Sequence, residues 1–311
     1  MSAPLKLTVP AMDEGTRVDA FIAHTVPGLS RREAKTLAKR GKVVRDGRAL
    51  LGSATVRAGD VLEVELPSPA TGSLPEIQVL REDARFLYLH KPAGLHTVRL
   101  RPDDPPTLAD VARSIDPRCG GASPDPREAG ALHRLDHGTS GVVVFARTPE
   151  AWAWGRAAIG GAWKLYLARS SAPPPSWPPP TASHVHLHPA PARWPPEARL
   201  PRPATPGVRV TWPLTASGPR GHRMRVDPQG QQAVSCVWCV DRTRSLFAVE
   251  LGSGRRHQIR AHMAALGLPL WGDDLYGAAP EASPVRLHAW AYQLGTEAPV
   301  VVADPPPWCE G

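Results

Sequence analysis

The sequence predicts an α+β fold in which a small basic domain is followed by a mixed or antiparallel sheet core with flanking helices. Its 311 residues give room for about two domains, and 42% hydrophobic residues suffice for a sizeable core. The apolar runs are short and bounded by Gly and Pro, as in strands, and none reaches the roughly 18 to 20 residues that span a bilayer. These features exclude a membrane protein and argue against an intrinsically disordered chain.

The first domain, residues 1–67, is predicted to contain a capped helix and two tight turns. Ser30 followed by Glu33 has the spacing of a capping box, and Gly41 marks the helix end. A helix is therefore expected after Ser30. The other elements expected here are strands over residues 42–45 and 61–66 and turns at Asp46-Gly47 and Gly59-Asp60.

Positive charge is concentrated in the same domain. Between Ser30 and Arg48, eight Lys and Arg residues stand against two acidic residues, whereas the whole chain has a net charge of +8. Ala34, Leu37 and Ala38 share one face of the predicted helix, which leaves its basic residues toward solvent. Such a run is often only a solvated helix face. The alternative is a surface for a polyanionic partner.

The motifs of this region resemble the S4 RNA-binding domain over about residues 15–67. They are Arg17 to Ile22, Leu29 to Ala34, Gly41-Lys42-Val43, Asp46-Gly47 and Ala58-Gly59-Asp60. The resemblance implies that the basic helix face and the turn after it bind RNA phosphates, with an affinity that falls steeply with salt. The residues that this resemblance assigns to RNA are Arg31, Arg32, Lys35, Lys39 and Lys42.

The second domain, residues 79–311, follows a linker at residues 68–78. Strand-like runs over residues 79–83 and 86–90 lead to Lys91-Pro92-Ala93-Gly94-Leu95, whose Pro and Gly predict a turn. The domain is therefore expected to begin with two short strands.

A carboxylate stands beside basic residues farther along the chain. Asp136 follows His133 and Arg134 in a Gly-containing loop, directly before an apolar strand over residues 142–146. Loops at the ends of buried strands commonly display reactive side chains. Such a cluster by itself is more often a structural ion pair, so these residues alone leave both interpretations open.

A second polar cluster begins at the Gly-rich turn 252–254 and continues into a helix that Gly267 and Pro269 end. His257 and Arg260 are expected to share one face of that helix. Histidines at positions 133, 257 and 262 raise the question of a metal site. Helical metal pairs usually have i, i+4 spacing with an acidic companion, so we expect no metal.

Together these segments resemble the RluA-type family of pseudouridine synthases over nearly the whole chain. Each motif alone is weak, whereas their joint occurrence in the family's order is specific. The matching residues are His90 to Leu95, His133 to Asp136 with Thr139-Ser140-Gly141, Lys164 to Ala168, Gly254-Arg255 with His257 to Arg260 and His262, Gly267 with Pro269, Gly272-Asp273 with Leu275-Tyr276-Gly277, and Leu287-His288-Ala289.

The resemblance implies isomerisation of uridine to pseudouridine within RNA, without a cofactor. Asp136 matches the catalytic aspartate, which either attacks C1′ or takes a sugar proton. Arg260 is expected to be its cationic partner, and Tyr166 to stack on the base near the C5 proton. The target uridine is expected to be flipped out, with Arg134 at the vacated position. Arg255 and His257 are expected to contact RNA.

Three stretches depart from the family pattern, and one of them, residues 223–235, follows it only loosely. His137 and Gly138 stand where the family more often has an Arg and another residue. Residues 171–206 hold 13 of the 37 prolines, which indicates an insertion that we expect to be solvated and partly disordered.

The remaining expectations concern location, partners and activity. The N-terminus lacks a basic segment followed by an apolar run, and the four cysteines form no disulfide framework, so we expect a cytoplasmic protein. The expected partner is ribosomal RNA of the large subunit, bound by a monomer. The alternative is a non-catalytic RNA-binding or ribosome-assembly protein that retains the fold.

Overall fold

The computed structural model describes residues 4–26, 29–66, 73–101, 104–195, 199–277 and 283–309. The chain divides into two compact units, one made of residues 1–75 and 98–130 and the other of residues 76–97 and 131–311. Residues 68–72 of the predicted linker lie outside the described residues, whereas residues 73–78 are described. Within the described ranges, no helix is both long enough and apolar enough to cross a membrane.

The first unit begins with a small sheet and two helices. Helices α1 (Val18–Thr25) and α2 (Arg31–Lys39) pack against each other. The sheet has the order β1-β4-β2-β3 and is antiparallel throughout. Its strands are β1 (Leu5–Thr8), β2 (Val43–Arg45), β3 (Arg48–Ala49) and β4 (Val61–Val64). The core between helices and sheet includes Phe21, Ile22, Ala34, Val43 and Leu62.

The capping box predicted at the start of α2 is confirmed. Ser30 Oγ accepts from the Glu33 N–H, and the Glu33 carboxylate accepts from the Ser30 N–H at 2.7 Å. Local sequence was sufficient here because both partners lie within one helical turn. The predicted turn at Asp46-Gly47 is also present, since both residues have positive φ, 51° and 73°.

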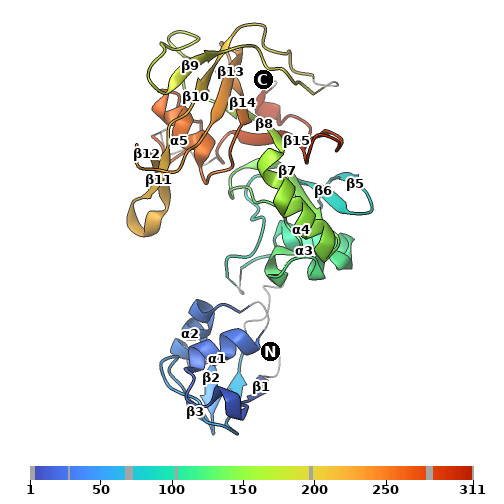
Figure 1. Cartoon of the computed structure of the whole chain (residues 1–311), viewed down its shortest axis with the longest axis vertical. Coiled ribbons are helices and arrows are strands. Elements are labelled where there is room, and N and C mark those ends of the chain that lie inside the picture. The colour runs from blue at the N-terminus through green and yellow to red at the C-terminus, as the bar shows by residue number, and fades with distance from the viewer. Residues whose placement is uncertain are drawn as a thin grey trace. The chain divides into compact units, whose positions relative to one another are not determined.

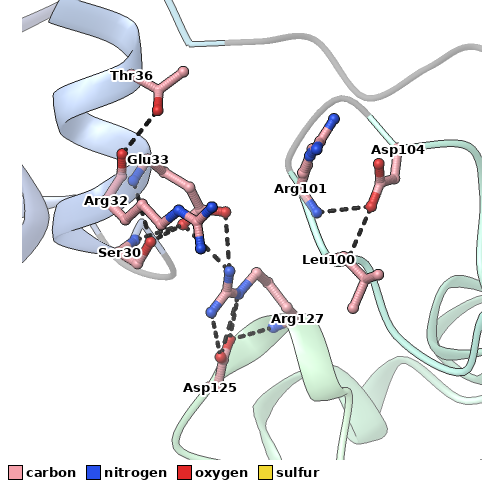
Figure 2. Close-up of polar contacts among 9 residues, drawn as sticks. All are labelled: Ser30, Arg32, Glu33, Thr36, Leu100, Arg101, Asp104, Asp125 and Arg127. Atoms are coloured by element: carbon pink, nitrogen blue, oxygen red, sulfur yellow. Dashed lines mark hydrogen bonds and ion pairs between the residues drawn. The ribbon is translucent and has the colours of Figure 1, made fainter. Parts of the chain in front are cut away.

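Residues 98–130 complete the first unit with α3 (Leu108–Ile115) and the short 3-10 helices Pro117–Gly121 and Pro126–Glu128. Arg127 joins this segment to α2, as Figure 2 shows. Its guanidinium lies 2.8 Å from Asp125 and 3.0 Å from Glu33, so Glu33 both caps α2 and accepts this ion pair.

A mixed sheet forms the centre of the second unit, as predicted. Its order is β5-β6-β7-β15-β8-β14-β13-β10-β9, with β16 paired to β15, and Figure 1 shows it from β9 in yellow to β5 in cyan. Only the β7–β15 pairing is parallel among the described strands. The strands are β5 (Val79–Glu82), β6 (Phe86–Lys91), β7 (Ser140–Ala146), β8 (Trp163–Arg169), β9 (Val185–His188), β10 (Gly207–Val210), β13 (Ser235–Asp241), β14 (Leu246–Leu251), β15 (Leu287–Gln293) and β16 (Val301–Val302).

Helices flank this sheet. Helix α4 (Pro149–Ala158) packs against β7, and α5 (Gln258–Ala265) packs against β13 and against a separate hairpin, β11 (Leu214–Ser217) with β12 (Arg223–Val226). Short 3-10 helices cover residues 159–161, 219–221 and 307–309. The sheet and α5 enclose an apolar cluster that includes Phe247, Val249 and Met263.

The Pro-rich insertion is more ordered than the sequence indicated. Its strand β9 pairs with β10 along four residues and forms one end of the large sheet. Trp177 packs edge-on against Phe247, and Trp194 packs against Trp290 with ring centroids 5.0 Å apart. Most of the described residues 171–195 and 199–206 are exposed, as the prediction of a solvated segment requires, while β9 and the two tryptophans attach the segment to the sheet and the core.

Gly141 sets the approach of β7 to β15. It has φ 119°, and a Cβ atom there would lie 2.1 Å from the carbonyl oxygen of Ala289. Only glycine fits this close backbone contact. Since Ala289 pairs with Tyr166 on its other side, Gly141 brings the loop before β7 next to β8.

Candidate active site

Asp136 lies in the loop before β7, and 33% of its side chain is exposed. The buried hydroxyl of Thr97 holds this loop, since it accepts from the Leu135 N–H and donates to the Leu135 carbonyl oxygen, both at 3.1 Å. Leu135 directly precedes Asp136. The backbone that carries the carboxylate is therefore fixed by a side chain from another segment.

Lys91, the last residue of β6, is fully buried beside the same loop. Its ammonium group donates to the carbonyl oxygens of Pro92 (3.0 Å), Leu95 (2.6 Å) and His137 (3.2 Å). Burial lowers the pKa of Lys91 to about 7, against the opposing effect of the Asp136 charge. Since His137 follows Asp136, Lys91 ties the turn after β6 to the Asp136 loop.

Arg260 on α5 brings a positive charge to Asp136. Its Nη1 lies 3.6 Å from Asp136 Oδ2, and only 9% of its side chain is exposed. Two further nitrogens, Nε and Nη2, donate to the fully buried carboxylate of Asp273, each at 2.7 Å. This bidentate pair fixes the guanidinium plane and leaves Nη1 for Asp136. Buried charges need such partners because desolvation alone disfavours them.

Tyr166 approaches the site from β8, where it pairs with Val249 and Ala289 on the neighbouring strands. Burial raises the pKa of its hydroxyl well above the usual range, and the charge of Asp136 adds to the effect. The phenol is therefore neutral at physiological pH. A loop, a strand and a helix thus bring Asp136, Tyr166 and Arg260 together.

His257 also reaches Asp136, although the expected shared helical face with Arg260 is wrong. His257 precedes α5 as its N-cap residue, with a left-handed backbone (φ 51°, ψ 18°). Its Nε2 nevertheless lies 3.7 Å from Asp136 Oδ2. The side chain meets the carboxylate because of a turn, not because of helical spacing.

The residues predicted to contact RNA lie in both units. Arg134 in the Asp136 loop and Arg255 before α5 are exposed. On α2, four predicted residues are exposed in the same way: Arg31, Arg32, Lys35 and Lys39. Lys42, directly before β2, is half-buried and forms an ion pair with Glu65. Arg31 is also paired, since its Nε lies 3.1 Å from the carboxylate of the buried Asp19.

Three residues around the site were not predicted from the sequence as functional: Lys91, Asp273 and Tyr276. The Lys-Pro pair at the end of an apolar strand was a visible signal for Lys91, whereas Asp273 resembled an ordinary turn residue. Within the described part of the chain, no group of three or more His, Cys, Asp or Glu side chains is arranged to hold a metal ion.

The segment that carries the loop carboxylate, the buried arginine and the strand tyrosine matches a known family. The family model described as RNA pseudouridylate synthase matches residues 85–265, a range that contains Asp136, Tyr166 and Arg260. The chain therefore belongs to the RNA pseudouridine synthase family. Its activity is the isomerisation of uridine to pseudouridine in RNA.

Individual relatives are similar over most of the chain. Ribosomal large subunit pseudouridine synthase D of Xanthomonas campestris is 33% identical, covering 87% of this chain and 74% of that protein. The protein of the same name from Pseudomonas aeruginosa is 30% identical, and the match covers 89% of this chain and 78% of that protein. Among solved structures, human RNA Pseudouridylate Synthase Domain Containing 1 shares the fold, with a TM-score of 0.50 at 21% identity, covering 76% of this chain and 85% of that one.

Proposed function

We propose that this protein isomerises uridine in large-subunit ribosomal RNA, with Asp136 as the reacting carboxylate. The observation that carries the proposal is the position of Asp136, one-third exposed in a loop and 3.6 Å from an arginine whose other nitrogens are occupied by a buried carboxylate. The partially exposed carboxylate is open to a nucleotide, while Arg260 keeps a positive charge beside it. Two relatives named for the large ribosomal subunit support the substrate.

The reaction breaks the C1′–N1 bond, turns the uracil over and joins C5 to C1′. Asp136 serves either by attacking C1′ or by taking a sugar proton. Tyr166 offers a neutral aromatic ring on which the uracil can stack, with its hydroxyl near the C5 proton. Since a base inside a helix is out of reach, the target uridine is flipped out, and the exposed Arg134 fills the space it leaves.

The N-terminal residues up to 67 act as an S4-like RNA-binding domain in this proposal, followed by a linker and a catalytic domain that starts at residue 79. Four exposed basic side chains on α2 support this role, because a row of cations on one helix face suits a phosphate backbone. These residues are Arg31, Arg32, Lys35 and Lys39. Lys42, Arg255 and His257 complete the proposed RNA contacts.

We also propose that the protein is a cytoplasmic monomer that needs no cofactor. All four of its cysteines are free thiols, which suits a reducing compartment.

Mapping pseudouridines in ribosomal RNA tests the substrate. RNA from cells that lack this protein should lose one or more large-subunit pseudouridines, and expression of the wild-type protein should restore them. Expression of Asp136→Asn should not. If the pseudouridines of large-subunit RNA are unchanged and a pseudouridine in another RNA is lost, the proposed substrate is wrong. The pseudouridine synthase activity would still stand.

A further inference from the structure

His257 lies between the Asp136 carboxylate and a buried tyrosine. Its Nε2 is 3.7 Å from Asp136 Oδ2, and its Nδ1 is 3.2 Å from the hydroxyl of Tyr276. Arg260 approaches the same carboxylate oxygen at 3.6 Å. One oxygen of Asp136 therefore faces two nitrogen groups, which come from a turn and from the helix after it.

The hydrogen bonds of Tyr276 determine which nitrogen of His257 carries the proton. The Tyr276 oxygen accepts from the Met224 N–H at 2.8 Å, and only 6% of this residue is exposed. A buried hydroxyl hydrogen needs an acceptor, and Nδ1 of His257 is within reach. When Tyr276 donates to Nδ1, the neutral imidazole holds its proton on Nε2, which faces Asp136.

The backbone at His257 is unusual for a residue with a side chain. Its φ of 51° lies in the left-handed region, which residues other than glycine adopt uncommonly, Asn, Asp and His more often than the rest. Gln258 holds the turn in place, since its side-chain oxygen accepts from Ser253 Oγ and the Arg255 N–H. Such backbone strain persists where the surrounding structure fixes it, and it is concentrated at functional sites.

We infer that His257 is a positioning residue for the isomerisation: Tyr276 fixes its tautomer, and its Nε2–H, together with Arg260, orients one oxygen of Asp136 and leaves the other to react. This inference rests on the proposed role of Asp136. It assigns to His257 a task beyond RNA contact and assigns to Tyr276 a task that the sequence did not indicate.

Burial favours the neutral form of His257. Burial lowers its pKa most; the positive charges of Arg260 and Arg256 lower it further, whereas Asp136 and Asp273 oppose the shift. Protonation in acid would place a hydrogen on Nδ1 and remove the acceptor for Tyr276. Protonation would therefore break the hydrogen bond that fixes the tautomer, while the ring would keep its Nε2–H toward Asp136.

Three substitutions separate positioning from a purely structural role. In His257→Gln, the side-chain nitrogen can take the place of Nε2, whereas in His257→Asn it can reach only the position of Nδ1. Asn tolerates the left-handed backbone better than Gln does. If His257 only maintains the left-handed turn, the Asn variant should be the more active of the two. If His257 positions Asp136, the Gln variant should be the more active. Tyr276→Phe removes the hydroxyl that fixes the tautomer.

The measurement is single-turnover release of tritium from [5-³H]uridine-labelled ribosomal RNA taken from cells that lack the protein. His257→Asn should lower the rate by about 10- to 100-fold, the usual effect of losing a group that orients a reactive one. His257→Gln should stay within about 5-fold of wild type, and Tyr276→Phe should lie between them. RNA affinity should fall by less than the single-turnover rate does, since the larger loss concerns orientation of the carboxylate.

The control is His186→Gln, at an exposed histidine on β9, which should behave as wild type. If the wild type is active and His257→Asn releases tritium at least as fast as His257→Gln, the inference is wrong. A wild type that releases no tritium would instead overturn the proposed function and the inference with it.

Discussion

The buried pair between Arg260 and Asp273 supports a sharp stability prediction. Asp273→Asn keeps the shape of the side chain and removes its charge, which leaves the guanidinium in the interior with Asp136 as its remaining carboxylate, at 3.6 Å. Breaking a buried ion pair by removing one partner costs about 3 to 5 kcal/mol. That is a decrease of about 150- to 5,000-fold in the ratio of folded to unfolded protein.

Urea unfolding followed by tryptophan fluorescence measures this loss, since the chain contains 10 tryptophans. The double variant Arg260→Met with Asp273→Asn removes both charges and should regain at least about 2 kcal/mol over Asp273→Asn alone. The double variant should be inactive, because the methionine at position 260 brings no positive charge to Asp136. A loss below about 1 kcal/mol in the single variant, or no recovery in the double variant, would refute the reasoning about this pair.

Three other predictions follow from the same structure. Burial lowers the pKa values of His133 and His288 to about 3, so the unfolded chain binds more protons than the folded one below pH 6.5. The free energy of unfolding should therefore fall by about 2 kcal/mol per histidine between pH 6.5 and pH 5, and His133→Phe should remove about 2 kcal/mol of the total loss in a pH series of urea titrations. Gly141→Ala should cost about 3 kcal/mol or more, because its Cβ would overlap a carbonyl oxygen of β15; a melting temperature equal to wild type would contradict that contact. Arg32→Ala and Lys35→Ala should each flatten the plot of log RNA affinity against log salt by about 0.7 to 1, and a parallel plot would show that these side chains do not meet phosphates.

Sequence alone predicted the features that depend on neighbouring residues. The capping box of α2 and the Asp46-Gly47 turn need contacts across only a few positions, so their residue types were sufficient. The class of fold was predicted from short strand-like runs together with the family resemblance.

The way the site residues come together could not be predicted from local sequence patterns. Asp136, Tyr166 and Arg260 come from three separate elements, and only the family resemblance related them before the structure did. His257 was placed on a helical face because the periodic pattern hides the left-handed turn before α5. The insertion resembled a solvated loop because its prolines outnumber the two tryptophans that hold it on the core.

The measurement that tests the account most directly is tritium release from [5-³H]uridine-labelled ribosomal RNA by wild type and Asp136→Asn, with both proteins shown to be folded and to bind RNA equally. The account predicts release by the wild type and none above background by the variant, because the amide can neither attack C1′ nor take a sugar proton. Release by Asp136→Asn at the wild-type rate would contradict the central claim that the Asp136 carboxylate performs the isomerisation.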